Sequence, residues 1–241
     1  MIKLFHTERV WSEIREMVWS LTEGPHQAGQ VQDSELAWML EQKLATKFGR
    51  SHCITTASCT DALIISLWCL DLPPGSRVAV SAYTYIATAH AVARAGYIPV
   101  PIDVNDDYTI NVGLIENCAA VVAVDVFGNM SNWDWLESLV IPVICDAAQS
   151  LESHDGLMYS VQHGVTACTS FSPSKPITCW GSGGAIFTDE FDVFQAARRL
   201  RIHGRPVTGD QYLHTGLNSM MSSFEVACTM ACLENGDKWL K

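Results

Sequence analysis

Apolar residues recur at helical spacing in the first fifty positions of the chain. The two runs have their apolar positions at Val10, Ile14, Val18 and Leu21 and at Leu36, Met39, Leu40, Leu44 and Phe48. Each run predicts an amphipathic helix. The first helix is expected to end at Gly24-Pro25, a pair that breaks helices. The second is expected to begin at about Asp33 and to close at Gly49, because glycine favours the conformation found just after many helices.

From residue 50 onward, short apolar runs alternate with helical patterns. The runs that predict strands are 53–55, 78–81, 98–102, 120–126, 141–145, 166–171 and 184–188. Helices are expected after Thr60, Tyr85, Asn111 and Trp133, and over 191–202 and about 222–240. This alternation predicts an α/β fold, a mostly parallel seven-stranded sheet flanked by helices. We expect an N-terminal helical segment over 1–30 and one large domain over 31–241.

Composition narrows the class of protein. The chain has 241 residues and a formal charge of −11, which gives no electrostatic basis for binding nucleic acid or an anionic membrane. The N-terminus lacks a long apolar stretch with a cleavage site, and the longest apolar run, 119–127, is interrupted by Asp125. The nine cysteines are odd in number and lack a C-x-x-C pair, which is typical of free thiols in a reducing cytoplasm. We therefore expect a soluble, cytoplasmic protein.

Residues that could take part in binding or catalysis follow several of the predicted strands. This is where the ligands of open parallel sheets bind. Ser58-Cys59-Thr60 follows a strand and opens a helix, so its amides and hydroxyls are suited to holding a phosphate. The alternative is an ordinary helix cap. Tyr85 comes shortly after another strand, where its ring can stack on a planar cofactor or pack in the core or at an interface.

An acid and a lysine complete this set. Asp146 comes directly after a buried strand, where a carboxylate can pair with a protonated pyridine nitrogen or simply cap a helix. Lys175 lies among serines and before the glycine-rich turn 181–184. A desolvated lysine favours the neutral amine that attacks an aldehyde, whereas most single lysines are exposed loop residues. The order of phosphate cup, acid, lysine and glycine turn predicts pyridoxal 5'-phosphate chemistry.

Two further patterns were weighed as metal sites. Cys228 and Cys232 lie four residues apart on a predicted helix, and we interpret them as packing residues because no histidine pattern accompanies them. The eight histidines show no ligand spacing, so we predict no catalytic metal.

From about Gln27 to Lys241 the chain resembles the DegT/DnrJ/EryC1/StrS family of pyridoxal phosphate-dependent sugar aminotransferases, which have fold type I of the aspartate aminotransferase superfamily. The segments that carry the resemblance are 58–63, 84–88, 102–104, 127–128, Asp146-Ala147-Ala148-Gln149, 170–171 with Lys175, 183–185, 203–204 and 216–218. Cys59 departs from the pattern, since the family usually has glycine or another small residue there.

The resemblance implies a role for each matching residue. Lys175 would hold the cofactor through a Schiff base, and Asp146 would bind the pyridine nitrogen. Gln149 would contact the cofactor hydroxyl, and Tyr85 would stack over the ring. Ser58, Cys59, Thr60 and Ser170 would hold the phosphate. Asn218 would complete the phosphate site of a neighbouring subunit, which implies a homodimer with shared active sites.

The implied reaction converts a keto-sugar nucleotide to an amino-sugar nucleotide, with an amino acid, glutamate, as donor. Typical members continue into a C-terminal small domain, which we expect to be absent here or supplied by a separate chain. Two alternatives remain at this point. One is a sugar dehydratase or lyase of the same fold, although sugar dehydratases of the family have histidine in place of the lysine. The other is a non-catalytic subunit, or a partner-dependent subunit of a split enzyme.

Overall fold

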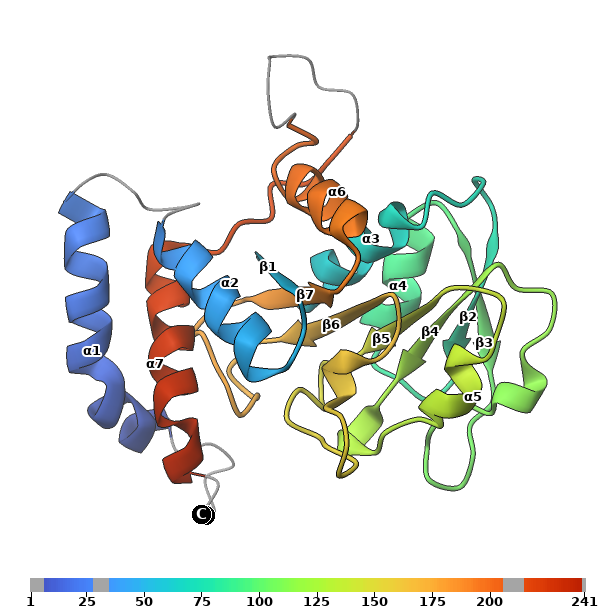
Figure 1. The fold of residues 1–241 in the computed structure, drawn as a ribbon, viewed down its shortest axis with the longest axis horizontal. Helices are drawn as coiled ribbons and strands as arrows, with labels where there is room; N and C mark the ends of the chain where they lie inside the picture. The colour runs from blue at the N-terminus through green and yellow to red at the C-terminus, as the bar shows by residue number, and fades with distance from the viewer. Residues whose placement is uncertain (1–6, 28–34, 206–214, 240–241) are drawn as a thin grey trace.

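A seven-stranded sheet forms the centre of the computed structural model, which describes residues 7–27, 35–205 and 215–239 (Figure 1). Its strands are β1 (His52–Thr56), β2 (Arg77–Ser81), β3 (Ile98–Ile102), β4 (Ala120–Val124), β5 (Val143–Asp146), β6 (Thr166–Ser170) and β7 (Gly184–Thr188). They are ordered β1-β7-β6-β5-β4-β2-β3. Strand β7 is antiparallel to both of its neighbours, and the other adjacent pairs are parallel. The predicted α/β fold with a mostly parallel seven-stranded sheet is confirmed.

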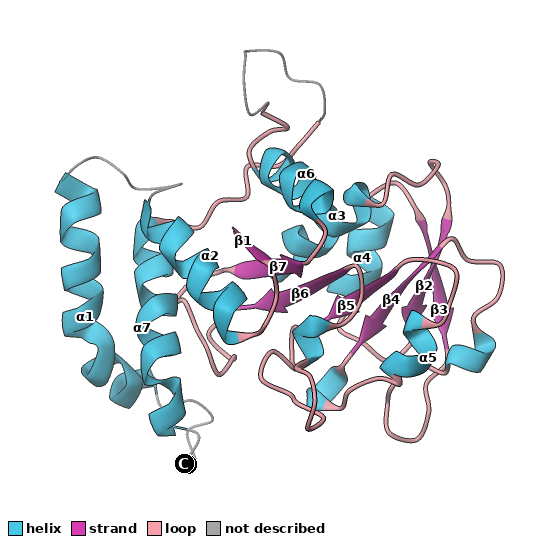
Figure 2. Cartoon of the chain, viewed as in Figure 1, coloured by secondary structure: helices cyan, strands magenta, loops and turns pink. Residues whose placement is uncertain are grey.

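Helices cover both faces of this sheet (Figure 2). They are α1 (Thr7–Gln27), α2 (Glu35–Lys47), α3 (Cys59–Cys69), α4 (Ala87–Arg94), α5 (Trp133–Glu137), α6 (Phe191–Arg201) and α7 (Ser223–Trp239). Three short 3-10 turns, η1 (Val112–Leu114), η2 (Val126–Gly128) and η3 (Ser160–Gln162), lie in the connections. The expected start of the second helix at Asp33 lies outside the described residues, whereas Gly49 follows α2 in the left-handed conformation, as predicted.

Two expectations about helices were wrong. The helix expected after Asn111 is a single 3-10 turn, which Asn111 caps by accepting a hydrogen bond from Gly113 N. Helix α1 continues through Gly24-Pro25 to Gln27. The helix ends two residues after Pro25, so the disruption that a proline causes falls in the final turn. Farther back along α1, Ile14 and Val18 are fully buried in the core.

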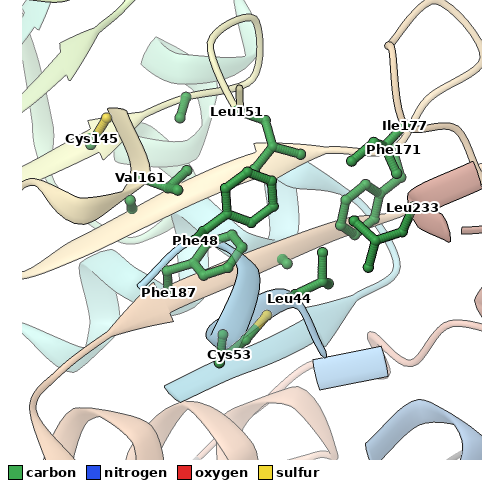
Figure 3. Packing of buried hydrophobic residues seen from close by; sticks show 14 of the residues in the cluster. Leu44, Phe48, Cys53, Cys145, Leu151, Val161, Phe171, Ile177, Phe187 and Leu233 are labelled. Carbon is green, nitrogen blue, oxygen red and sulfur yellow. The ribbon is translucent and has the colours of Figure 1, made fainter. Parts of the chain in front are cut away.

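Alternate residues of the strands pack on opposite faces of the sheet. In β4, Val121 and Ala123 join one apolar cluster, and Ala120 and Val122 join the other. Apolar residues of α3, α4 and α6 complete the cluster on the second face. Those of α1, α2, α5 and α7 complete the first, part of which is shown in Figure 3. The sheet is thus buried on both sides, and its strand ends are where polar chemistry is accessible.

A buried ion pair ties α2 and α6 to the first strand. Glu41 and Arg201 are both almost fully buried, and Arg201 Nη1 lies 2.6 Å from Glu41 Oε1. The same carboxylate oxygen accepts hydrogen bonds from the backbone N and the hydroxyl of Thr55. Because each partner neutralises the other, we expect the loss of either one to leave a buried charge.

All nine cysteines are free thiols, and Cys228 and Cys232 are fully buried in α7. The prediction that this pair packs as small apolar residues is confirmed. Within the described ranges, no group of three or more His, Cys, Asp or Glu side chains is placed to hold a metal ion. No helix in the same ranges has both the length and the apolar character needed to cross a bilayer.

Candidate active site

A cavity of about 510 Å³ opens at the carboxyl ends of the strands and gathers most of the predicted site residues. Eight of the nine predicted residues line it: Ser58, Cys59, Thr60, Tyr85, Asp146, Gln149, Ser170 and Lys175. The ninth, Asn218, does not. Residues without an assigned role in the sequence also contribute to the wall, among them Thr88, Ala148 and Ser182.

The N-terminus of α3 forms one end of the cavity. Ser58 is the N-cap residue, and its hydroxyl accepts a hydrogen bond from Asp61 N at 3.1 Å. The alternative interpretation of Ser58 as a helix cap is therefore confirmed. The backbone N–H groups of Cys59 and Thr60 belong to the first turn, where donors have no partner within the helix. These donors and the positive end of the helix dipole favour an anion at this position.

Gly184 lets strand β7 pass directly beneath this helix start. A Cβ atom there would lie 2.5 Å from Cys59 N and 2.7 Å from the carbonyl carbon of Ser58. Such contacts are shorter than real Cβ atoms make, so any other residue would push the helix start away. Gly184 also pairs in register with Ser170 of β6, which brings the Ser170 hydroxyl to the same end of the cavity.

Asp146 ends strand β5 and is 4% exposed. Burial raises the pKa of this carboxyl, whereas hydrogen bonds from Thr88 and Ala148 N and the positive charge of Lys175 act to lower it. Thr88 Oγ1 donates to Asp146 Oδ2 at 2.7 Å, and Ala148 N donates to Oδ1 at 3.2 Å. The chain therefore holds a buried carboxylate that lacks an ion-pair partner within 4 Å among the described residues.

Cys59 lies between the helix start and this acid. Its Sγ is 4.0 Å from Asp146 Oδ1, and it lines the cavity. Burial raises the pKa of the Cys59 thiol well above its ordinary value, and the charge of Asp146 raises it further. Cys59 is therefore a neutral thiol. It adds volume, but no charge, at a position where the family that the chain resembles usually has glycine or another small residue.

Lys175 projects from a loop that is anchored at both ends. Phe171 N donates to Gly183 O at 2.8 Å, and Cys179 N donates to Phe171 O at 2.9 Å. Phe171 and Ile177, which precede and follow Lys175 in the sequence, are buried in the core (Figure 3). Lys175 itself is half-buried. Anchored in this way, the loop presents one lysine to a cavity that otherwise contains hydroxyls, a thiol, an amide and an acid.

Gln149 and Tyr85 lie at the solvent side of the cavity. Phe127 N donates to Gln149 Oε1 at 2.9 Å, which leaves the amide nitrogen of Gln149 as the donor available to a ligand. Tyr85 is 75% exposed and makes no close ring contact with another described aromatic residue. Its ring is therefore free to cover a planar ligand.

Asn218 lies apart from this cavity, on the segment that follows the second gap in the described residues. It is exposed, and its neighbour Ser219 is fully buried. Ser219 Oγ donates to Asp61 Oδ2 at 2.8 Å and accepts from Ala57 N at 3.0 Å. This segment is thus fixed to the start of α3, while the Asn218 side chain faces outward.

Thr88 was missed by the sequence reasoning, although it lies within the segment 84–88 that carries the resemblance. Its position gave a weak signal, because it comes three residues after Tyr85 and so lies one helical turn further on. Together the residues of the cavity wall provide hydrogen-bond donors for an anion at one end, a buried acid without an ion-pair partner among the described residues, and the amine of Lys175. This donor set suits a flat ligand with a phosphate group, a basic nitrogen and an electrophilic carbon.

Comparison with known proteins places these residues in context. The model of the DegT/DnrJ/EryC1/StrS aminotransferase family matches residues 13–241. The UDP-2-acetamido-2-deoxy-3-oxo-D-glucuronate aminotransferase of Pseudomonas aeruginosa is 34% identical over 205 residues, which cover 81% of this chain and 57% of that protein. The chain spans little more than half the length of the curated relatives it matches.

Solved structures show the same fold. A DegT DnrJ EryC1 StrS aminotransferase from Brucella abortus has a TM-score of 0.89 and 27% identity, covering 99% of this chain and 68% of that chain. NtdA from Bacillus subtilis, solved with the bound cofactor PMP, has a TM-score of 0.83 and 24% identity, covering 96% of this chain and 54% of that chain. The expected architecture, the large domain of fold type I, is confirmed by these likenesses and by the order of the sheet.

Proposed function

The chain belongs to the DegT/DnrJ/EryC1/StrS aminotransferase family, and from this premise we propose that it acts as a pyridoxal phosphate-dependent aminotransferase. The reaction converts a keto-sugar nucleotide to an amino-sugar nucleotide, with glutamate as the amino donor. One observation supports this proposal above the others. Lys175 and Asp146 come from separate segments of the chain and line one cavity together with the N-terminus of α3.

The wall of the cavity fits the cofactor. The unpaired N–H groups at the start of α3, with Ser58, Cys59, Thr60 and Ser170, would hold the phosphate. Asp146 would pair with the protonated ring nitrogen, which gives this buried carboxylate the partner that it lacks. The Gln149 amide would donate to the ring hydroxyl, and Tyr85 would cover one ring face.

When bound, pyridoxal phosphate supplies an electron-accepting ring that stabilises negative charge at the substrate carbon. The chain contributes the groups around that ring. Lys175 would hold the cofactor through its amine, which the amino donor would release. The freed amine would then act as general base and acid, moving a proton from the substrate carbon to the cofactor. Asp146 keeps the ring nitrogen protonated throughout. The anchored 171–183 loop limits the positions that the lysine can reach.

A second, smaller cavity next to the first suggests where the acceptor sugar would bind. Lys175, Gln149 and Ser170 line both the main cavity and a neighbouring one of about 290 Å³. The neighbouring cavity is also lined by Glu152 and Ser153. We place the acceptor sugar on this side because a keto group there is next to the lysine, and because hydroxyl and carboxylate groups bind sugar hydroxyls.

We also propose that two copies of the chain form a homodimer with shared active sites. The outward position of Asn218 and the open cavity beside Tyr85 support this, since a partner's Asn218 can then complete the phosphate site. In this proposal residues 31–241 serve as the cofactor-binding large domain, and residues 1–30 form a helical segment that precedes it. The small domain of the family, whichever polypeptide carries it, covers the substrate side. The free cysteines suit a reducing cytoplasm.

The test is a product assay with the purified protein, pyridoxal phosphate, glutamate and UDP-2-acetamido-2-deoxy-3-oxo-D-glucuronate. The proposal predicts an amino-sugar nucleotide and an equal amount of 2-oxoglutarate. A deoxy-keto product formed without 2-oxoglutarate would identify a dehydratase instead. Uptake of cofactor with no turnover of any keto-sugar nucleotide would favour a partner-dependent subunit of a split enzyme.

A further inference from the structure

A chain of hydrogen bonds connects Asp146 to the turn that carries Tyr85. Thr88, the second residue of α4, is 1% exposed, and its Oγ1 lies 2.7 Å from Asp146 Oδ2. On its other side, Thr88 Oγ1 lies 2.9 Å from Thr84 Oγ1. Thr84 immediately precedes Tyr85 in the turn before α4. Both distances are those of ordinary hydroxyl hydrogen bonds.

The chemistry of the groups fixes the direction of this chain. An ionised carboxylate only accepts hydrogen bonds, and a threonine hydroxyl has a single proton to donate. Thr88 therefore donates its proton to an ionised Asp146 and accepts from Thr84. The Thr84 hydroxyl lies 2.9 Å from Thr88 Oγ1, closer than the 3.4 Å to its other acceptor, the backbone oxygen of Tyr85. If Asp146 were protonated, its own proton could be donated outward and the direction would no longer be fixed. Because a hydrogen bond donated to a carboxylate stabilises its charged form, the bond from Thr88 opposes the effect of burial, which raises the pKa of Asp146.

Few other groups assist Asp146. Among the described residues, Lys175 is the cation whose charge lowers the pKa of Asp146, and the charge of Asp125, which follows β4, raises it. Ala148 N donates a longer hydrogen bond of 3.2 Å. The pKa values of three thiols, those of Cys59, Cys145 and Cys168, are raised in part by the charge of Asp146. These thiols are neutral because burial raises the pKa of each. Thr88 thus makes the shortest hydrogen bond to the acid.

We propose that Thr88, oriented by Thr84, is a positioning residue that holds Asp146 ionised and in a single orientation, ready to receive a protonated ring nitrogen. This inference rests on the proposed function for the identity of the ring. It goes beyond that function because it states that two hydroxyl groups, those of Thr84 and Thr88, keep Asp146 ionised. These two linked hydroxyls are called the relay.

The relay is tested first on the cofactor-free protein. Free energies of unfolding are measured by chemical denaturation across a range of pH for the wild type, Thr88→Val, Asp146→Asn and the double variant. The inference predicts coupling between the two positions that grows as Asp146 ionises with rising pH. Coupling near zero at every pH would overturn it. This result does not depend on whether the protein binds pyridoxal phosphate.

The second test measures the dissociation constant for pyridoxal phosphate by fluorescence titration at neutral pH. Thr88→Val is expected to raise it about tenfold or more, as for the loss of a hydrogen bond to a charged group. Thr88→Ser retains the hydroxyl and is expected to restore most of the affinity, and Thr84→Val is expected to have an intermediate effect. Thr22→Val is the matched control, since Thr22 is 1% exposed and its hydroxyl bonds only to backbone oxygens of its own helix.

Equal affinities for Thr88→Val and the wild type would overturn the inference, as would equal losses for the valine and serine variants. If the wild type itself takes up no pyridoxal phosphate, the proposed function fails, and the inference fails with it as a statement about a bound ring. The coupling measured in the cofactor-free protein would then still decide whether Thr88 controls the charge of Asp146.

Discussion

The backbone N–H of Phe127 donates a 2.9 Å hydrogen bond to Oε1 of Gln149. Phe127 adopts a left-handed backbone conformation with φ of 57°, inside the short turn η2 that follows β4. An N–H group requires an acceptor, so this bond fixes which end of the Gln149 amide faces the cavity. The amide therefore presents hydrogen-bond donors to a ligand, and turning it over would exchange this bond for two donors facing each other.

Gln149→Glu tests this relationship. Glutamate retains an acceptor for Phe127 N but removes the donor and adds a negative charge beside the cofactor hydroxyl. We expect the affinity for pyridoxal phosphate to fall about tenfold or more, as judged by fluorescence titration. Gln162→Glu is the control, because Gln162 Oε1 also accepts from a backbone N–H, that of Tyr159, but lies outside the cavity. Unchanged affinity in Gln149→Glu would show that the donor is not used.

The buried carboxyl of Asp146 predicts a stability that depends on pH. Burial raises its pKa in the folded chain above the ordinary 3.8, so between these two values the folded protein holds a proton that the unfolded chain has released. Its contribution to the free energy of unfolding therefore falls as pH rises through that window. Asp146→Asn lacks this fall, and its stability relative to the wild type should increase with pH over the same window in cofactor-free protein.

The same substitution should reverse its effect once pyridoxal phosphate is added. The asparagine cannot neutralise a protonated ring nitrogen, so the variant should gain little thermal stability from the cofactor, whereas the wild type should gain several degrees. Melting curves with and without cofactor measure both effects. If pyridoxal phosphate stabilises Asp146→Asn as much as the wild type, Asp146 does not bind the cofactor.

Replacing Gly184 with any residue that has a side chain should disrupt the proposed phosphate site. Gly184→Ala places a Cβ within 2.5 Å of Cys59 N, so we expect the start of α3 to shift and cofactor affinity to drop at least tenfold. Gly236→Ala is the matched control. Gly236 lies within α7, and apart from its chain neighbours and its own helix backbone no described atom lies within 4 Å of a Cβ there, so alanine is expected to stabilise the helix by about 0.5–1 kcal/mol. Normal cofactor binding by Gly184→Ala would contradict the proposed phosphate position.

A mixing experiment tests the shared active site. In a heterodimer of Lys175→Ala and Asn218→Ala chains, one site has both mutations and the other has neither. We expect each variant alone to be impaired in amino transfer, and we expect the mixture to recover part of the activity through its intact site. Light scattering should report a dimer for both variants. If mixing restores nothing although mixed dimers form, Asn218 does not act across the interface.

Much of the fold could be predicted because strand and helix periods differ clearly along this chain. The expected extension of the fourth strand to residue 126 was wrong, because β4 ends at Val124 and Asp125 turns inward. There its carboxylate accepts hydrogen bonds from Ser131 N, Trp133 Nε1 and Ser160 Oγ. Ser131 and Trp133 lie six and eight residues after Asp125, and Ser160 lies 35 residues after it. The apolar pattern of the strand gives no sign of these hydrogen bonds, so it could not reveal the turn.

The candidate site was predictable where a charged residue comes after a predicted strand, as for Asp146, directly after an apolar run, and for Lys175, among serines before a glycine-rich turn. The sequence could not reveal Thr88, because its role depends on α4 and the end of β5 meeting across the sheet. A buried threonine in a helix has no distinguishing local pattern. The same holds for Phe127, which acts through its backbone N–H and an unusual φ rather than through its side chain.

The central claim is that Lys175 forms a covalent bond with pyridoxal phosphate in this cavity. The most direct test is to incubate the protein with the cofactor, reduce it with borohydride, digest it, and locate the added mass by mass spectrometry. The account predicts one modified residue, Lys175, together with a visible absorption band that is missing in Lys175→Ala. Modification of a different lysine, or a wild-type protein that stays unmodified, would contradict it.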